Sequence, residues 1–175
     1  MSSSKTATRT FSIKKELIQA LEKEAQNRNI STRSLINQTL DRCVRQTWPS
    51  EKTGVIVIGR YVIRDLFSEM SEEGVKKVAA SSAREHKIRA LLYGTTQKLE
   101  SVLEMMDKIT GPYFEWFKFI HTFNGRDHKI LLTHDMGRMW SVWLETYFIT
   151  FFMVMLDIPV KSSLTDSTVA LEFRA

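Results

Sequence analysis

Three hydroxyl side chains near the start of the chain, Thr8, Thr10 and Ser12, have the types and the spacing to contact a polar ligand. A hydroxyl both donates and accepts hydrogen bonds, and side chains two positions apart on a strand point to the same side. Because Phe11 and Ile13 alternate with them, we expect residues 8–13 to form a strand with one polar and one apolar face. Hydroxyls on such a face are suited to hydrogen-bond with the base edges in the major groove of DNA.

Basic side chains and helix amides close to this strand are suited to phosphate groups. Lys5 precedes the predicted strand, and Arg9 belongs to it. Ser31 is a predicted N-cap, so Thr32 and Arg33 begin a helix whose first backbone N–H groups have no partner within the helix. We therefore expect Lys5, Arg9, Ser31, Thr32 and Arg33 to contact phosphates.

The net positive charge is confined to the first part of the chain. Residues 1–50 contain nine Lys and Arg against four Asp and Glu, whereas residues 51–175 contain 16 of each. A basic module of this kind favours binding to a polyanion. The alternative is a solvated face on a small helical dimerisation module.

Two helices follow the predicted strand, each with an apolar row at helical spacing. The rows are Leu17, Leu21 and Ala25 in the first helix and Ile36, Leu40 and Cys43 in the second. The segment TRTFSIKKELIQALEKEAQNRNISTRSLINQTL resembles a ribbon-helix-helix domain of the MetJ/Arc superfamily, over roughly residues 7–46. The resemblance implies that two chains pair their strands into a ribbon, that Thr8, Thr10 and Ser12 contact bases, and that the start of the second helix binds phosphate.

The chain is predicted to be an α+β protein with two domains. Residues 1–47 form the ribbon-helix-helix domain, residues 48–54 a linker with the first Pro and Gly, and residues 55–175 a second domain. The patterns in this domain predict a ferredoxin-like βαββαβ order with extra helices. The expected helices are 60–70, 72–85, 99–109 and 137–156, and the expected strands are 87–93, 113–123, 128–134 and 168–173.

This layout is similar to that of the nickel-responsive ribbon-helix-helix regulators, but their metal ligands do not carry over, because no cysteine follows Cys43. Of the later histidines, only His121 and His128 are close enough on the predicted hairpin to share a metal ion. Ordinary hydrogen-bonded histidines are the favoured alternative, and no cofactor is expected. No Gly-rich phosphate loop, nucleophile elbow or neighbouring Cys–His pair is present, so we expect no enzyme.

The segment 137–156 is rich in aromatic residues but is interrupted by Glu145. The uncharged stretch after Glu145 is too short for a bilayer, so we expect no membrane partner and favour packing against another subunit over a ligand pocket. A single cysteine and the absence of an apolar leader at the start are typical of a cytoplasmic protein.

Together these patterns predict a cytoplasmic, sequence-specific DNA-binding regulator of transcription, acting as a homodimer or homotetramer on double-stranded DNA. The second domain is expected to join dimers or to respond to a small-molecule effector. The alternatives are a protein-interaction adaptor, an antitoxin, or a non-specific architectural DNA binder.

Overall fold

The computed structural model describes residues 7–53, 58–92, 94–112 and 114–175. The chain divides into two compact units, Met1–Val44 and Arg45–Ala175. The sequence patterns place this boundary at residue 47. The predicted phosphate contact Lys5 lies outside the described residues.

The N-terminal unit contains two helices, α1 (Lys15–Asn27) and α2 (Thr32–Arg42). Both were predicted, and the predicted cap is confirmed, because the Ser34 N–H donates to Ser31 Oγ at 3.1 Å. The strand predicted at 8–13 is not formed within the single chain, where residues 7–14 have no regular secondary structure; the prediction assigned its pairing partner to a second chain. A strand needs a hydrogen-bonded neighbour, and the described part of this chain offers none to that segment.

Residues 43–53, part of which we expected to be an irregular linker, are helical. They form a π-helical turn, η1 (Cys43–Thr47), and the short helix α3 (Trp48–Thr53).

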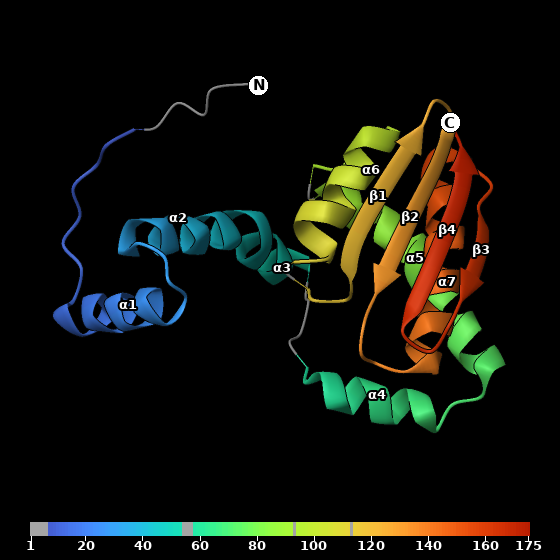
Figure 1. The fold of residues 1–175 in the computed structure, drawn as a ribbon, viewed down its shortest axis with the longest axis horizontal. Helices are drawn as coiled ribbons and strands as arrows, with labels where there is room; N and C mark the ends of the chain where they lie inside the picture. Colours follow the sequence, from blue (N-terminus) through green and yellow to red (C-terminus); the bar gives the residue numbers. More distant parts are fainter. Residues whose placement is uncertain (1–6, 54–57, 93, 113) are drawn as a thin grey trace. The chain divides into compact units, whose positions relative to one another are not determined.

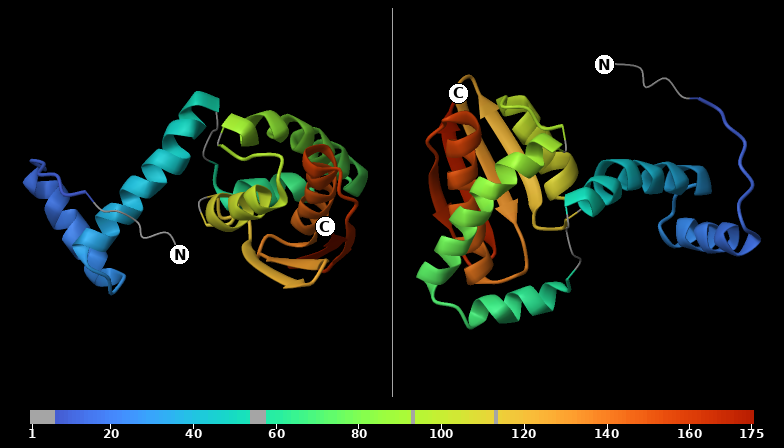
Figure 2. Two further views of the ribbon diagram at one scale, coloured as in Figure 1. Left: turned by 90° about the horizontal axis from the view of Figure 1, so that it is seen from above. Right: turned by 180° about the vertical axis from the view of Figure 1, so that it is seen from behind.

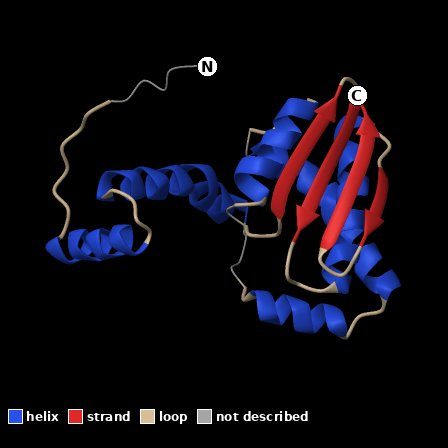
Figure 3. Cartoon of the chain, in the orientation of Figure 1, coloured by secondary structure: helices blue, strands red, loops and turns tan. Residues whose placement is uncertain are grey.

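The C-terminal unit is an α+β structure in which a four-stranded antiparallel sheet has helices α5, α6 and α7 on one face (Figures 1 and 3). Its further elements are α4 (Arg60–Ser68), α5 (Glu72–Leu92), α6 (Leu99–Met105) with its π-helical continuation η2 (Met106–Thr110), β1 (Lys118–Asn124), β2 (Asp127–Thr133), α7 (Arg138–Leu156), β3 (Lys161–Leu164) and β4 (Thr168–Arg174).

The predicted hairpin is confirmed as β1 and β2, with Phe123 opposite His128 and His121 opposite Ile130. Gly125 occupies the turn with φ of +67°, a conformation that glycine adopts without strain. The sheet order β1-β2-β4-β3 corrects the ferredoxin-like prediction. Residues 87–92, expected as a strand, are the last turns of α5, and the polar strand β3 was not predicted.

Helix α7 is the centre of the unit, between the sheet and α5 (Figure 2). On the sheet side, Phe148 contacts Phe117 and Phe152 contacts Phe173. On the other side lies α5, whose small buried residues allow the bulky rings of α7 to approach. These are Val75, Ala79, Ala83 and Ala90.

By length and composition α7 could cross a membrane, but ten of its 19 residues are buried within the unit. The prediction that its aromatic side chains pack against another subunit is therefore wrong. They are covered by the chain's own sheet, by α5 and by the ring of Trp116, which lies 5.0 Å from Trp143.

Candidate functional site

The predicted DNA contacts are not assembled into one site by the structure. Thr8, Arg9, Thr10 and Ser12 are exposed in the irregular segment before α1. Ser31, Thr32 and Arg33 lie at the start of α2, where Ser31 Oγ is engaged by the Ser34 amide.

His121 and His128 are brought together as predicted. Their rings stack with centroids 5.2 Å apart, and His121 Nε2 and His128 Nδ1 share a hydrogen bond of 3.0 Å. Burial, and secondarily the neighbouring His128, lower the pKa of His121. The residues that the structure describes contain no group of three or more His, Cys, Asp or Glu able to hold a metal ion.

His134 lies beyond the end of β2 and is separated from that pair. The Met136 N–H donates to its Nδ1 at 3.2 Å, so in the neutral ring the proton is on Nε2, which lies 2.8 Å from Ser141 Oγ. Both ring nitrogens of His134 therefore serve to join the end of β2 to the start of α7.

The sequence patterns did not single out His86. Its pKa is shifted more strongly than that of any other histidine of the unit. Its Nδ1 is hydrogen-bonded to the Tyr147 hydroxyl, and the rings of Trp116 and Phe151 lie beside it. Burial, with a smaller contribution from Arg89, lowers the pKa of His86 to about 4. Burial also raises the pKa of Tyr147, so both groups are neutral at pH 7.

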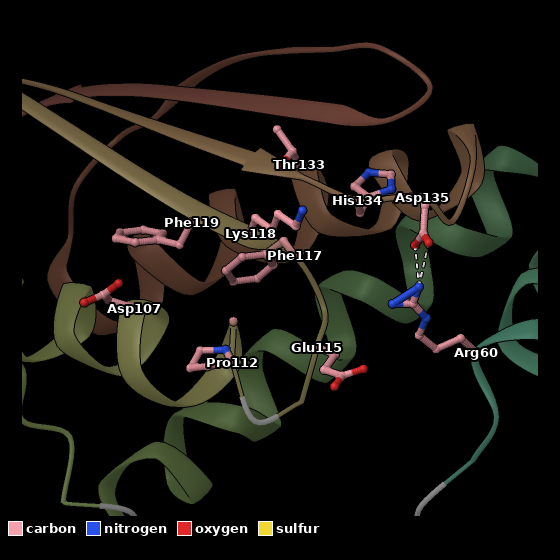
Figure 4. Close-up of a pocket in the computed structure, with 11 residues that line it drawn as sticks. Arg60, Asp107, Pro112, Glu115, Phe117, Lys118, Phe119, Thr133, His134 and Asp135 are labelled. Carbon is pink, nitrogen blue, oxygen red and sulfur yellow. Dashed lines mark hydrogen bonds and ion pairs between the residues drawn. The ribbon is translucent and has the colours of Figure 1, made fainter. Parts of the chain in front are cut away.

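A groove of about 640 Å³ runs beside the first residues of β1 (Figure 4). Phe117 and Phe119 form its apolar wall. Arg60 and Asp135 also line it and form an ion pair, in which Arg60 Nη2 donates to Asp135 Oδ1 at 2.7 Å and to Oδ2 at 2.6 Å. The hydrogen bond from Arg60 lowers the pKa of the Asp135 carboxyl. Asp135 is therefore a charged structural partner rather than a proton donor. The full lining is Arg60, Asp107, Gly111, Pro112, Glu115, Phe117, Lys118, Phe119, Thr133, His134 and Asp135.

The N-terminal unit carries a large exposed apolar surface for its size. Of its described hydrophobic residues only Ala25 and Leu35 are buried. Leu40, on α2, is 56% exposed, and Val44, in the following turn η1, is 53% exposed. We call the exposed set the N-terminal apolar surface; it comprises Phe11, Ile13, Leu17, Leu40 and Val44.

No protein-family model matches the chain, and no curated protein matches it. Among solved structures, the chain is similar to trafficking protein particle complex subunit 3 from Naegleria fowleri, covalently bound to palmitic acid. The identity is 11%, the match covers 80% of this chain and 96% of that chain, and the TM-score is 0.40. This similarity is too low to transfer a ligand or a cellular role to the present chain.

The prediction of a DNA-binding regulator of transcription, with double-stranded DNA as its partner, is corrected by two findings. The strand at 8–13, on which base contacts depended, is not formed. No protein-family model of a DNA-binding domain matches the chain.

Proposed function

We propose that this chain is a non-enzymatic protein-assembly subunit whose N-terminal unit joins it to a second copy of itself. The observation that carries the proposal is the N-terminal apolar surface, which the N-terminal unit itself leaves exposed. The proposed function is thus an interaction module of the adaptor class.

The size of the N-terminal unit supports association. A folded unit of about 40 residues usually needs a disulfide, a metal ion or a partner to be stable. Cys43 is a free thiol and the only cysteine of the chain, and the described residues contain no cluster that could hold a metal. Contact with a protein partner is the source of stability that we propose.

The arrangement of the apolar residues favours a second copy as that partner. Leu40 near the end of α2 and Val44 in the π-helical turn η1 that continues it are four positions apart, about one helical turn. Two such helices related by a two-fold axis present the same surface to each other, which makes the contact self-complementary. Fully covering a leucine or valine side chain contributes about 1.5–3 kcal/mol, so a few such residues suffice to favour pairing.

The polar groups of the C-terminal unit support a structural rather than a catalytic role. His134 links β2 to α7, and Asp135 is held by Arg60. His86 is engaged by Tyr147 among aromatic rings. Each of these groups is satisfied by the chain itself.

Light scattering of the purified full-length chain tests the proposal. Leu40→Glu places a charge in the N-terminal apolar surface and is expected to halve the mass of the oligomer. Gln38→Glu adds the same charge at an exposed polar position of α2 and is expected to leave the mass unchanged.

Chemical cross-linking provides a second measurement that does not depend on the folding of a variant. Cys43 lies next to Val44 and is partly exposed, so a short thiol-reactive cross-linker is expected to join two wild-type chains. A wild-type chain that is monomeric at micromolar concentration, or equal masses for Leu40→Glu and Gln38→Glu, would show the proposal to be wrong.

A further inference from the structure

We infer that β1 is a second self-association site, at which the edge strands of two copies pair antiparallel about His121 and form one continuous eight-stranded sheet. The inference extends the proposed function, because it adds an interface on the C-terminal unit to the one proposed on the N-terminal unit.

The first argument is the contrast between the two edges of the sheet. Strand β1 forms one edge and β3 the other (Figure 1). The edge strand β3 has four residues and follows closely on Pro159. The seven residues of β1 pair one-to-one with β2, without a bulge. Edge strands are usually protected by shortness, proline, bulges or charge, and β1 has only Lys118 for this purpose.

The second argument is the exposure along β1. Ile120 is 53% exposed and Phe123 is 60% exposed. The groove described above borders the first residues of this strand. A further strand at the usual spacing of about 4.8 Å would cover these side chains and pair the outer backbone groups.

The third argument identifies the occupant as a second copy. The sequence of β1 is KFIHTFN, and an antiparallel pairing centred on His121 sets each residue opposite a compatible one. Phe119 faces the partner's Phe123, and Ile120 faces the partner's Thr122. Aromatic and β-branched cross-strand pairs stabilise antiparallel sheets.

Charge also agrees with this register. Lys118, the single Lys or Arg of β1, faces the neutral Asn124 of the partner subunit, so no lysine opposes a lysine directly. If the two-fold axis passed through residue 120 or residue 122 instead, Phe119 and Phe123 would no longer both face a phenylalanine of the partner subunit. The sequence of β1 therefore favours the two-fold arrangement about His121.

Disulfide trapping tests the register directly. In a Cys43→Ser background, His121→Cys sets two thiols opposite each other and is expected to form a covalent dimer under mild oxidation. Phe119→Cys is the matched control. In this register position 119 of one chain lies four strand positions, roughly 14 Å, from position 119 of the other chain, which is beyond the reach of a disulfide. A mixture of Phe119→Cys and Phe123→Cys chains is expected to cross-link between the two variants.

Mass measurements separate this interface from the N-terminal one. The wild type is expected to be larger than a dimer, and Ile120→Lys, which adds a charge to the exposed edge, is expected to reduce it to a dimer. Ser163→Lys adds the same charge on the exposed strand β3 and is expected to have no effect.

The outcomes for the two interfaces are distinguishable. If Leu40→Glu leaves the mass unchanged while His121→Cys cross-links, the N-terminal proposal fails and the β1 interface holds. If His121→Cys gives no covalent dimer, or Phe119→Cys cross-links equally well, the β1 pairing is overturned. The absence of a covalent dimer for His121→Cys is also the result expected if β1 binds a different protein instead of a second copy, and it overturns the pairing in that case too.

Discussion

Acid is expected to destabilise this protein through His86, which the structure keeps neutral. The imidazole lies between α5 and α7, hydrogen-bonded to the Tyr147 hydroxyl and close to the rings of Trp116 and Phe151. Its environment contains Arg89 but offers no carboxylate among the causes that shift its pKa. A proton on His86 would therefore be buried without a compensating negative charge, which is unfavourable.

The sign and size of the effect follow from the two pKa values. Burial lowers the pKa of His86 from 6.5 to about 4 in the folded chain. The unfolded chain therefore binds more protons between these values, and folding stability is complete above pH 6.5 and declines as the pH falls toward 4. Between pH 7 and pH 5 the loss attributable to His86 is about 2 kcal/mol.

Urea unfolding of wild type and His86→Gln at several pH values, at one fixed protein concentration, measures this contribution. The variant keeps a polar side chain near Tyr147 but does not titrate. The wild type is expected to lose about 2 kcal/mol more than the variant between pH 7 and pH 5. All other side chains are the same in the two proteins, so their contributions cancel in the comparison. Parallel stability–pH curves for the two proteins would refute the argument.

Two further predictions concern the C-terminal unit. Phe148→Ala is expected to lower the free energy of unfolding by about 3–5 kcal/mol, because Phe148 is fully buried. Met153→Ala on the same helix is expected to lower it much less, because Met153 is 44% exposed. Similar unfolding midpoints for these two variants would contradict the placement of α7. Arg60→Ala breaks an exposed ion pair with Asp135 and is expected to cost less than about 1 kcal/mol. Arg64→Ala is the control, because it removes an exposed ion pair with the sequence neighbour Asp65. A large difference between the thermal unfolding temperatures of the two variants would contradict the exposed character of the Arg60–Asp135 pair.

Elements with strong local patterns were predictable from the sequence. The hairpin was found because two apolar runs flank Asn124–Asp127, where Gly125 takes a positive φ. The long helix α7 and the cap at Ser31 were found for the same kind of reason. The proximity of His121 and His128 followed from the hairpin register.

Features that depend on contacts distant in sequence were not predictable. Residues 87–92 have strand-like composition, but α5 continues through them because Ala90 keeps the buried stripe against the rest of the unit. Strand β3 is polar and short, and it exists because β4 supplies its hydrogen-bonding partner. The environment of His86 is created by α7 and by Trp116, which are at least 30 residues away in the sequence.

The same distinction explains why the nucleic-acid prediction failed and why we propose self-association instead. Alternation of hydroxyl and apolar residues at 8–13 determines which side chains would share a face, but not whether a neighbouring strand is present. The exposure of Leu40 on α2 and of Val44 in η1, in contrast, is a property of the folded unit, and it carries a free-energy cost in water whatever the ligand. The edge β1 likewise leaves backbone groups and Ile120 without cover. Both surfaces are stabilised by another protein chain, and at β1 the strand's own sequence specifies a second copy.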